Sequence, residues 1–133
     1  MKASYLIDTD RVIDHFNKVE KVTRKLEELV PKGLALSIIS LAELYEGVYY
    51  SRDSEESQKV LKDFLASDLL ILGLDEEICK VFGKERGKLR RKGKIIGDFD
   101  LLIASTCIYY DLIHLTNNRK HYEAVKGLNI ISV

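Results

Sequence analysis

The feature that most constrains this 133-residue sequence is an alternation between short apolar runs and longer stretches with helical spacing. Runs of strand length are followed by segments in which apolar residues recur every three or four positions. Strands that alternate with helices predict a mainly parallel sheet covered by helices on both faces. The predicted strands lie at residues 3–7, 34–38, 69–72, 112–116 and 128–132. The predicted helices cover residues 10–17, 19–30, 54–67 and 99–110, with one more from Ser40 and one that Asp75 caps.

The length of the chain is that of one domain, since domains average about 150 residues. We therefore expect residues 1–133 to form a single domain. No apolar run approaches the roughly 20 residues that a membrane-spanning helix needs. The first residues run directly into a predicted strand, without a signal-peptide pattern. These features predict a cytoplasmic protein without a membrane partner, in which Cys79 and Cys107 are reduced core thiols.

Charge is balanced over the whole chain, with 21 basic and 21 acidic residues, which excludes a globally basic nucleic-acid coat. The segment 84–94 nevertheless holds seven basic residues and one acidic residue. Charge segregated in this way predicts a local cationic surface. The alternative is a solvated helix end, because cations near a helix C-terminus also complement the helix dipole.

Acidic and amide side chains follow the predicted strands. Asp8 ends the first strand, Glu43 lies one turn into the helix after the second, Asp98 and Asp100 begin a buried helix, and Asn118 follows the fourth strand. If the strands are parallel, these groups converge at one edge of the sheet. Carboxylates in close proximity repel unless a cation binds, and oxygen ligands without His or Cys favour Mg²⁺ or Mn²⁺ over zinc.

Each of these residues also has a purely structural interpretation. Asp8 can cap the first helix, and Asp98 or Asp100 the buried one. Ser40 and Glu43 have the spacing of a capping box. The pair at 117–118 can be a turn.

Four ordered blocks of the sequence resemble the PIN domain, and most closely the VapC-type toxins of toxin–antitoxin pairs. Residues 5–10 (YLIDTD) are similar to the opening apolar-Asp-Thr signature, and residues 36–48 (LSIISLAELYEGV) to the Ser-x-x-Ser-x-x-Glu-Leu-x-x-Gly block. Residues 96–104 (IGDFDLLIA) resemble the Gly-x-x-Asp-x-x-Ile-Ala block, and residues 115–130 the closing Thr-x-Asn pattern with its aromatic residue. The blocks span nearly the whole chain.

The resemblance implies a three-layer α/β/α PIN-like domain that hydrolyses RNA phosphodiesters with Mg²⁺ or Mn²⁺. Carried over residue by residue, Asp8 and Asp100 are the principal metal ligands, and Glu43 is the third acid, which binds directly or through water. Asp98 is an additional carboxylate, and Asn118 stands where the family often has a fourth acid. The hydroxyls expected to orient the carboxylates are those of Thr9, Ser40 and Thr116.

The resemblance also implies partners. The basic segment becomes the RNA-binding surface, through Arg86, Arg90, Arg91, Lys92 and Lys94, or a contact for an acidic antitoxin tail. A small VapB-like antitoxin and a homodimer are expected. The tyrosines at 45, 49, 50, 109 and 110 are expected in the core or a dimer interface. His114 is expected in the core or at its edge, and His121 on an ordinary surface.

The sequence leaves two other functions open. A PIN-like fold can serve as a non-catalytic subunit that binds RNA or protein. The pair Asp8 and Asp10 also matches the first motif of haloacid-dehalogenase-type aspartyl phosphatases, although the later motif of that class is incomplete here. The acids alone do not choose between RNA and DNA.

Overall fold

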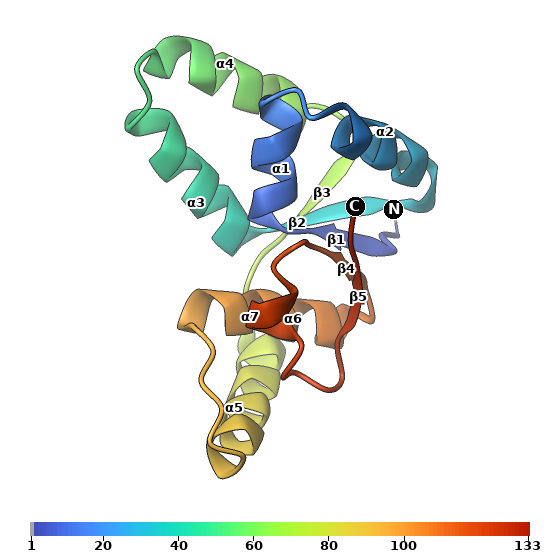
Figure 1. Ribbon diagram of the computed structural model, residues 1–133, viewed down its shortest axis with the longest axis vertical. Helices are drawn as coiled ribbons and strands as arrows, with labels where there is room; N and C mark the ends of the chain where they lie inside the picture. The colour runs from blue at the N-terminus through green and yellow to red at the C-terminus, as the bar shows by residue number, and fades with distance from the viewer. Residues whose placement is uncertain (1) are drawn as a thin grey trace.

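A five-stranded sheet forms the centre of the computed structural model, which describes residues 2–133 (Figure 1). The strands lie in the order β3-β2-β1-β4-β5, and every neighbouring pair is parallel. Their bounds are β1 Tyr5–Ile7, β2 Leu34–Ser37, β3 Leu69–Leu72, β4 Ile113–Leu115 and β5 Asn129–Ile131. The predicted parallel α/β sheet is therefore confirmed.

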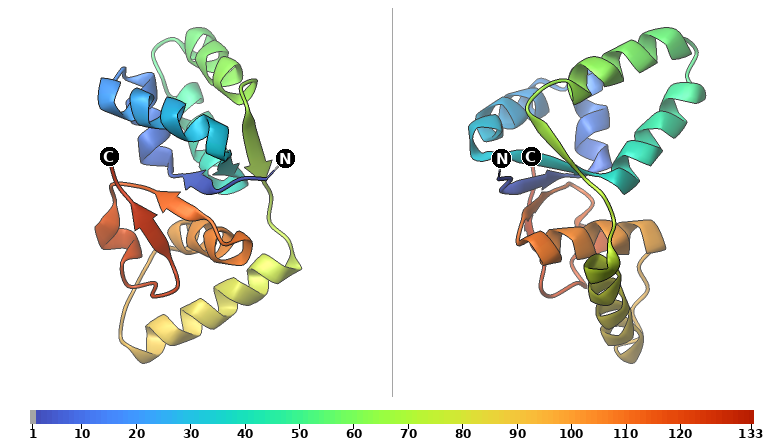
Figure 2. Two further views of the ribbon diagram at one scale, coloured as in Figure 1. Left: turned by 90° about the vertical axis from the view of Figure 1, so that its right-hand side faces the viewer. Right: turned by 180° about the vertical axis from the view of Figure 1, so that it is seen from behind.

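Helices cover the two faces of the sheet as separate layers (Figures 1 and 2). One layer consists of α1 Thr9–Phe16, α2 Glu20–Leu29, α3 Ile38–Tyr49 and α4 Ser54–Leu65, with a short 3₁₀ turn at Val30–Lys32. The other consists of α5 Glu76–Arg91, α6 Asp98–Tyr110 and α7 Arg119–Tyr122. The three-layer arrangement follows from the burial of both sheet faces, which parallel strands require.

Two neighbouring residues of β1 pack into different parts of the apolar core, one in each helical layer. Ile7 packs with Val12 and other residues of the α1–α4 layer, whereas Leu6 packs with Ile103 and Cys107 of α6. All five side chains are buried. Successive side chains of a strand point to opposite faces, so this central strand anchors both layers at once. A third cluster, which includes Leu89, Leu101 and Tyr122, joins α5, α6 and α7.

The structure corrects the predicted start of one helix and confirms the cap of another. Helix α3 begins at Ile38 rather than at Ser40, because the side chain of Ser37 accepts a hydrogen bond from the Ile39 amide at 3.0 Å and caps the helix. Ser40 is a buried residue inside the helix, so the capping-box interpretation is wrong. The prediction for Asp75 is confirmed, since its Oδ1 accepts from the Ile78 amide at 2.9 Å.

Cys79 lies on the exposed side of α5, so the prediction of a core thiol is wrong for this residue. Ile78, its neighbour, carries the buried face of the helix instead. Cys107 is buried, as predicted, and both cysteines are free. Within residues 2–133, every helix is too short or too polar to cross a bilayer.

Candidate metal centre

The candidate site lies at the topological switch point of the sheet. From the central strand β1, the chain first builds β2 and β3 on one side and later returns to add β4 and β5 on the other. Asp8 follows β1 directly, and Thr116 follows β4 directly. Ligands of open parallel sheets bind at the carboxyl ends of the strands at such a switch point.

Asp8 is a buried carboxylate, with 3% of its surface exposed. Its Oδ2 accepts a hydrogen bond from the Thr116 hydroxyl at 2.6 Å. The phenol oxygen of Tyr122 lies 3.1 Å from Asp8 Oδ1 and 3.2 Å from Asp100 Oδ1. A single hydroxyl group therefore bridges two carboxylates whose positions are 92 residues apart in the sequence.

Glu43 joins the same region through the residue that follows Asp8. The hydroxyl of Thr9 donates to Glu43 Oε1 at 2.7 Å, and it lies 2.9 Å from the hydroxyl of Ser40. The structure thus brings the hydroxyls of Thr9, Ser40 and Thr116 to the carboxylates or to one another. Hydrogen bonds of this kind fix the orientation of carboxylate ligands.

Burial and mutual repulsion destabilise the ionised form of the carboxylates Asp8 and Glu43. Burial raises the pKa of Asp8, and the charge of Asp100 adds to this, although hydrogen bonds from Thr116 and Tyr122 oppose it. Burial also raises the pKa of Glu43, against the hydrogen bond from Thr9, and the charges of Asp8 and Asp100 contribute in the same direction. A bound cation would relieve both effects.

The donor set fits a hydrated hard cation rather than a closed protein cage. Within residues 2–133, no three His, Cys, Asp or Glu side chains form a group that could hold a metal ion by themselves. Asp8 and Asp100 are nevertheless separated by one phenol oxygen, and both offer only oxygen atoms. Mg²⁺ usually keeps several waters and takes one or two carboxylates, so these residues fit it.

Two of the predicted additional ligands, Asp98 and Asn118, are exposed and contact other groups. The Asp98 side chain is 80% exposed and pairs with Arg86 at 2.6 Å. Asn118 is exposed at the start of α7, and its amide N–H donates to the Thr116 hydroxyl at 3.0 Å. Helix α6 begins after Gly97 without a side-chain cap, so the interpretation of Asp98 or Asp100 as a cap is wrong.

Asp10 is held by groups other than the candidate metal ligands. Its Oδ2 accepts from the Asn117 amide at 3.1 Å, and its Oδ1 lies 3.3 Å from the Arg11 guanidinium. Asp10 therefore ties α1 to the loop after β4. An aspartyl phosphatase needs both acids of its first motif at the reacting phosphate, so this arrangement disfavours that function.

Three further residues surround the carboxylates without having been predicted as functional. In the sequence, Tyr122 stands out only as the aromatic residue of the closing block. His114 is fully buried, as predicted, but its Nε2 lies 3.7 Å from Asp8 Oδ1, and burial lowers the pKa of His114 to about 4. His121 places Nδ1 3.1 Å from Asp100 Oδ2. His114 lies in the predicted fourth strand, whereas His121 and Tyr122 lie in the short helix α7, which no sequence pattern predicts.

The basic segment divides into an engaged arginine and exposed cations. Arg86 donates to the Ile96 carbonyl at 2.8 Å and to Asp98, and its guanidinium lies over the Phe82 ring. It therefore holds α5 to the segment before α6. The remaining predicted RNA-binding residues are exposed at the end of α5 and just beyond it: Arg90, Arg91, Lys92 and Lys94.

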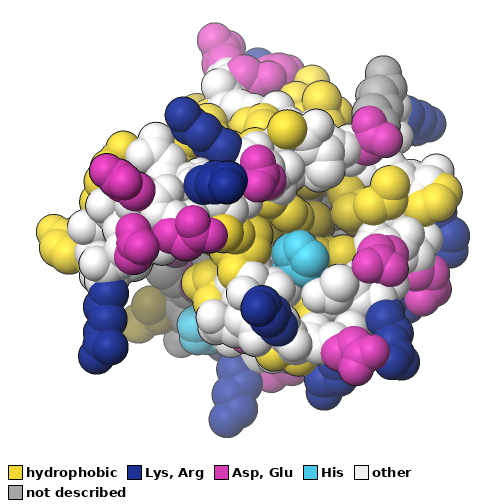
Figure 3. Space-filling model, turned by 90° about the horizontal axis from the view of Figure 1, so that it is seen from above, with side chains coloured by type: hydrophobic (Ala, Val, Ile, Leu, Met, Phe, Trp, Pro, Cys, Tyr) yellow, Lys and Arg dark blue, Asp and Glu magenta, His cyan; other side chains and the backbone are white. Residues whose placement is uncertain are grey.

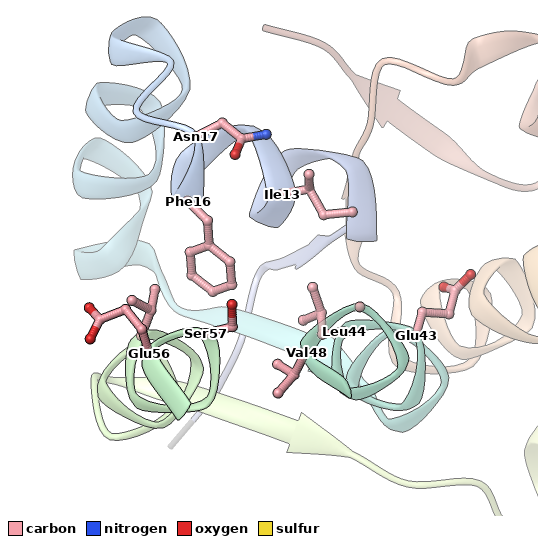
Figure 4. A pocket seen from close by; sticks show the side chains of 10 residues that line it. Ile13, Phe16, Asn17, Glu43, Leu44, Val48, Glu56 and Ser57 are labelled. Atoms are coloured by element: carbon pink, nitrogen blue, oxygen red, sulfur yellow. The ribbon is translucent and has the colours of Figure 1, made fainter. Parts of the chain in front are cut away.

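An apolar groove lies in the α1–α4 layer, on the other side of the carboxylates from the basic segment. Figure 3, seen from that side, shows apolar side chains in a hollow with charged side chains around it. In Figure 4, side chains from α1, α3 and α4 line a cavity of about 370 Å³, among them Ile13, Phe16, Leu44 and Val48. Glu43 belongs to the lining of the same cavity. Glu43 therefore belongs both to the edge of the groove and to the candidate metal centre.

Comparison with known proteins identifies the class. The family model of the PIN domain matches residues 5–127, and the chain belongs to the PIN-domain family. Among its relatives is Ribonuclease VapC1 of Methanocaldococcus jannaschii, 37% identical over 97% of this chain and 88% of the relative. Ribonuclease VapC2 of Rickettsia felis is 36% identical, with 93% of each chain covered. The crystal structure of VapBC2 from Rickettsia felis, bound to a promoter DNA fragment, gives a TM-score of 0.90 at 34% identity, covering 97% of this chain and 98% of the other.

Proposed function

We propose that residues 1–133 form one PIN-like domain that acts as a metal-dependent endoribonuclease, the toxin of a toxin–antitoxin pair. The observation that carries the proposal is the convergence of Asp8 and Asp100 on one phenol group, with Glu43 beside them. The names of the VapC relatives supply the substrate class, RNA. The oxygen-only donor set supports Mg²⁺ or Mn²⁺ as the ion.

In this proposal, each residue has a distinct task. Asp8 and Asp100 would hold the ion, and Glu43 would bind it directly or through water. Thr116 donates a hydrogen bond to Asp8, and the single phenol proton of Tyr122 is shared between Asp8 and Asp100, so the two hydroxyls fix both principal carboxylates. When bound, the ion lowers the pKa of a bound water and stabilises negative charge on the phosphate. No side-chain nucleophile is needed.

The test is cleavage of single-stranded RNA by the purified chain. We expect cleavage with Mg²⁺ or Mn²⁺ and none in EDTA, and a loss of about 100-fold or more for Asp8→Asn and for Asp100→Asn. Asp98→Asn is the matched control, because Asp98 is an exposed acid of the same helix turn as Asp100 and pairs with Arg86. It should cleave as the unaltered chain does.

Three outcomes would contradict the proposal. Undiminished cleavage by both Asp8→Asn and Asp100→Asn would remove the site assignment. Preferential cleavage of DNA of the same sequence would change the substrate. An absence of any cleavage, with RNA binding preserved, would favour the non-catalytic alternative.

We further infer that the apolar groove accepts a helix of a small VapB-like antitoxin. The solved relative from Rickettsia felis is a VapBC complex. The groove offers the apolar side chains that an amphipathic helix requires, including Ile13, which is 46% exposed. An occupant that reaches Glu43 would cover the carboxylates and block access of RNA. Co-purification with the product of a neighbouring gene tests this partner.

A homodimer is the second assembly that we propose. Tyr49, Tyr50, Tyr109 and Tyr110 are exposed, so the expectation that they lie in the core is wrong, and an interface is the remaining expectation. Tyr45, by contrast, packs against the core. Light scattering across a concentration series tests the dimer, which should give twice the mass of one chain.

A further inference from the structure

A cavity lined by lysines lies on the side of the carboxylates opposite the apolar groove. It lies between the segment that joins α5 to α6 and the region of α7, and its volume is about 460 Å³. We call it the lysine pocket after four of its residues: Lys92, Lys94, Lys120 and Lys126. One acid, Glu123, also contributes to its lining.

The four pocket lysines differ from several basic residues of α5 in their surroundings. Lys80, Arg86 and Lys88 each pair with a carboxylate at 2.9 Å or closer. Within residues 2–133, none of the four pocket lysines lies within 4.0 Å of a carboxylate. Like charges that converge on one cavity repel, and an anion in the cavity would offset that repulsion.

The lysine pocket adjoins the candidate metal centre at one residue, His121. This residue belongs to the lining of the pocket, and its Nδ1 lies 3.1 Å from Asp100 Oδ2. The next residue, Tyr122, carries the phenol group that bridges Asp8 and Asp100. An extended anionic chain that crosses the carboxylates therefore reaches the pocket within a short distance.

The pocket also offers an apolar surface. Ile95 belongs to its lining and is 96% exposed. A phosphate needs only cations and hydrogen-bond donors, whereas a nucleotide also presents a flat base and a ribose. The lysines and the aliphatic side chain of Ile95 together offer contacts to both the charged and the apolar parts of a nucleotide.

We propose that the lysine pocket holds a phosphate group of single-stranded RNA next to the phosphodiester that is cut, an inference that rests on the proposed nuclease function. The basic segment alone does not make this site. Lys120 and Lys126 come from the chain around α7, more than 25 residues after Lys94. Arg86, which belongs to the basic segment, is engaged elsewhere.

An acidic protein segment is the competing occupant. The observations favour RNA for two reasons. The pocket adjoins the carboxylates through His121, as a substrate strand requires. The apolar groove on the other side already provides the surface that suits a protein helix.

The test is RNA binding without metal, so that cleavage does not interfere. A labelled single-stranded RNA of about 15 nucleotides is titrated in EDTA at several salt concentrations, with anisotropy as the readout. The double variant Lys120→Gln, Lys126→Gln should weaken binding by about tenfold and reduce the salt slope by about 0.7 for each phosphate that the variant no longer neutralises. The matched control is Lys59→Gln, Lys62→Gln, which removes two exposed lysines of α4.

With Mg²⁺ or Mn²⁺, the pocket variant should raise KM for RNA and keep kcat, because the two lysines bind the strand outside the reacting bond. Equal effects of the pocket and control variants on RNA affinity would overturn the inference, and so would a chain that binds no RNA in EDTA. Poly-glutamate that binds more tightly than RNA, and loses binding in the pocket variant alone, would assign the pocket to an acidic protein. A chain that binds RNA through these lysines but cleaves none would keep the pocket and end the proposed function.

Discussion

The apolar groove and the lysine pocket flank the same carboxylates but are built from opposite chemistry. The groove is lined by Ile13, Phe16, Leu44 and Val48, and the acid Glu43 belongs to the same lining. Half of the residues that line the lysine pocket are lysines. Apolar burial responds weakly to salt, whereas phosphate binding falls steeply as salt rises. The proposed antitoxin helix and the proposed RNA strand would therefore bind through different chemistry, and a change of salt concentration would separate the two interactions.

The largest effect should come from a charge placed in the groove. Ile13→Glu would bury an unpaired carboxylate against an apolar partner helix, which should weaken antitoxin binding by about 100-fold. RNA cleavage by the chain alone should not change, because Ile13 is about half exposed and lines the groove rather than the metal centre. Calorimetry with the co-expressed antitoxin measures the first effect.

The control for the groove is Ile95→Glu, which places the same charge in the lysine pocket. It should leave antitoxin binding unchanged and weaken RNA binding. If instead the two variants affect both partners alike, the groove and the pocket act as one surface rather than two.

Tyr122→Phe tests the group that lies between the two surfaces. The ring stays in its buried position, but the hydroxyl that bridges Asp8 and Asp100 is removed. Removal of such supporting hydrogen bonds typically costs 10- to 100-fold in metal affinity, so we expect about a tenfold loss of Mn²⁺ affinity by calorimetry. RNA affinity in EDTA should stay the same. Unchanged Mn²⁺ affinity would mean that the phenol only packs.

Arg86→Gln sharpens the distinction between structural and RNA-binding cations. Its hydrogen bonds to the Ile96 carbonyl and to Asp98 hold α5 to the segment before α6. We expect the free energy of unfolding to fall by about 1–2 kcal/mol, with RNA affinity unchanged. Arg90→Gln should do the reverse, because Arg90 is exposed. Urea unfolding and anisotropy measure the two quantities, and a loss of RNA affinity in Arg86→Gln alone would contradict the assignment.

The smallest expected effect is a loss of folding stability at acidic pH. Burial lowers the pKa of His114 to about 4 and also lowers that of His15. In the unfolded chain the two imidazoles bind protons near pH 6.5, whereas in the folded chain burial keeps them neutral to lower pH. The full folding stability is therefore present above pH 6.5 and falls as the pH drops towards the folded-state pKa. From about pH 7 to about pH 5.5, His114 should account for about 1 kcal/mol of lost stability. Urea unfolding of His114→Gln should show a smaller acid loss than that of His121→Gln, and equal losses would argue against the assignment.

The sequence predicted the sheet well because apolar runs and helical spacing are local signals. It also predicted that Asp8, Glu43 and Asp100 lie near one another, from their positions after predicted strands and at the start of a buried helix. The family resemblance then singled out Asp100 over Asp98. The sequence did not predict the bridging role of Tyr122 or the contact of His121 with Asp100. Helix α7, which positions both, has only four residues and no apolar period to reveal it.

The lysine pocket was missed for a related reason. A run of charges at 84–94 is visible in the sequence, but the contribution of Lys120 and Lys126 depends on how the chain folds back after β4. Similarly, the engagement of Arg86 depends on Asp98, twelve positions away. Long-range contacts of this kind are set by the whole fold and not by local pattern.

The central position of β1 has a consequence for the emergence of activity during synthesis. Asp8 leaves the ribosome well before its hydroxyl donors, because Thr116 and Tyr122 follow it by 108 and 114 residues. Parallel pairing of β1 with β4 must also await residues 113–115. A nascent chain would therefore lack the assembled carboxylate site until residues 113–122 have left the ribosome, which gives a protein partner time to be present when the site first forms.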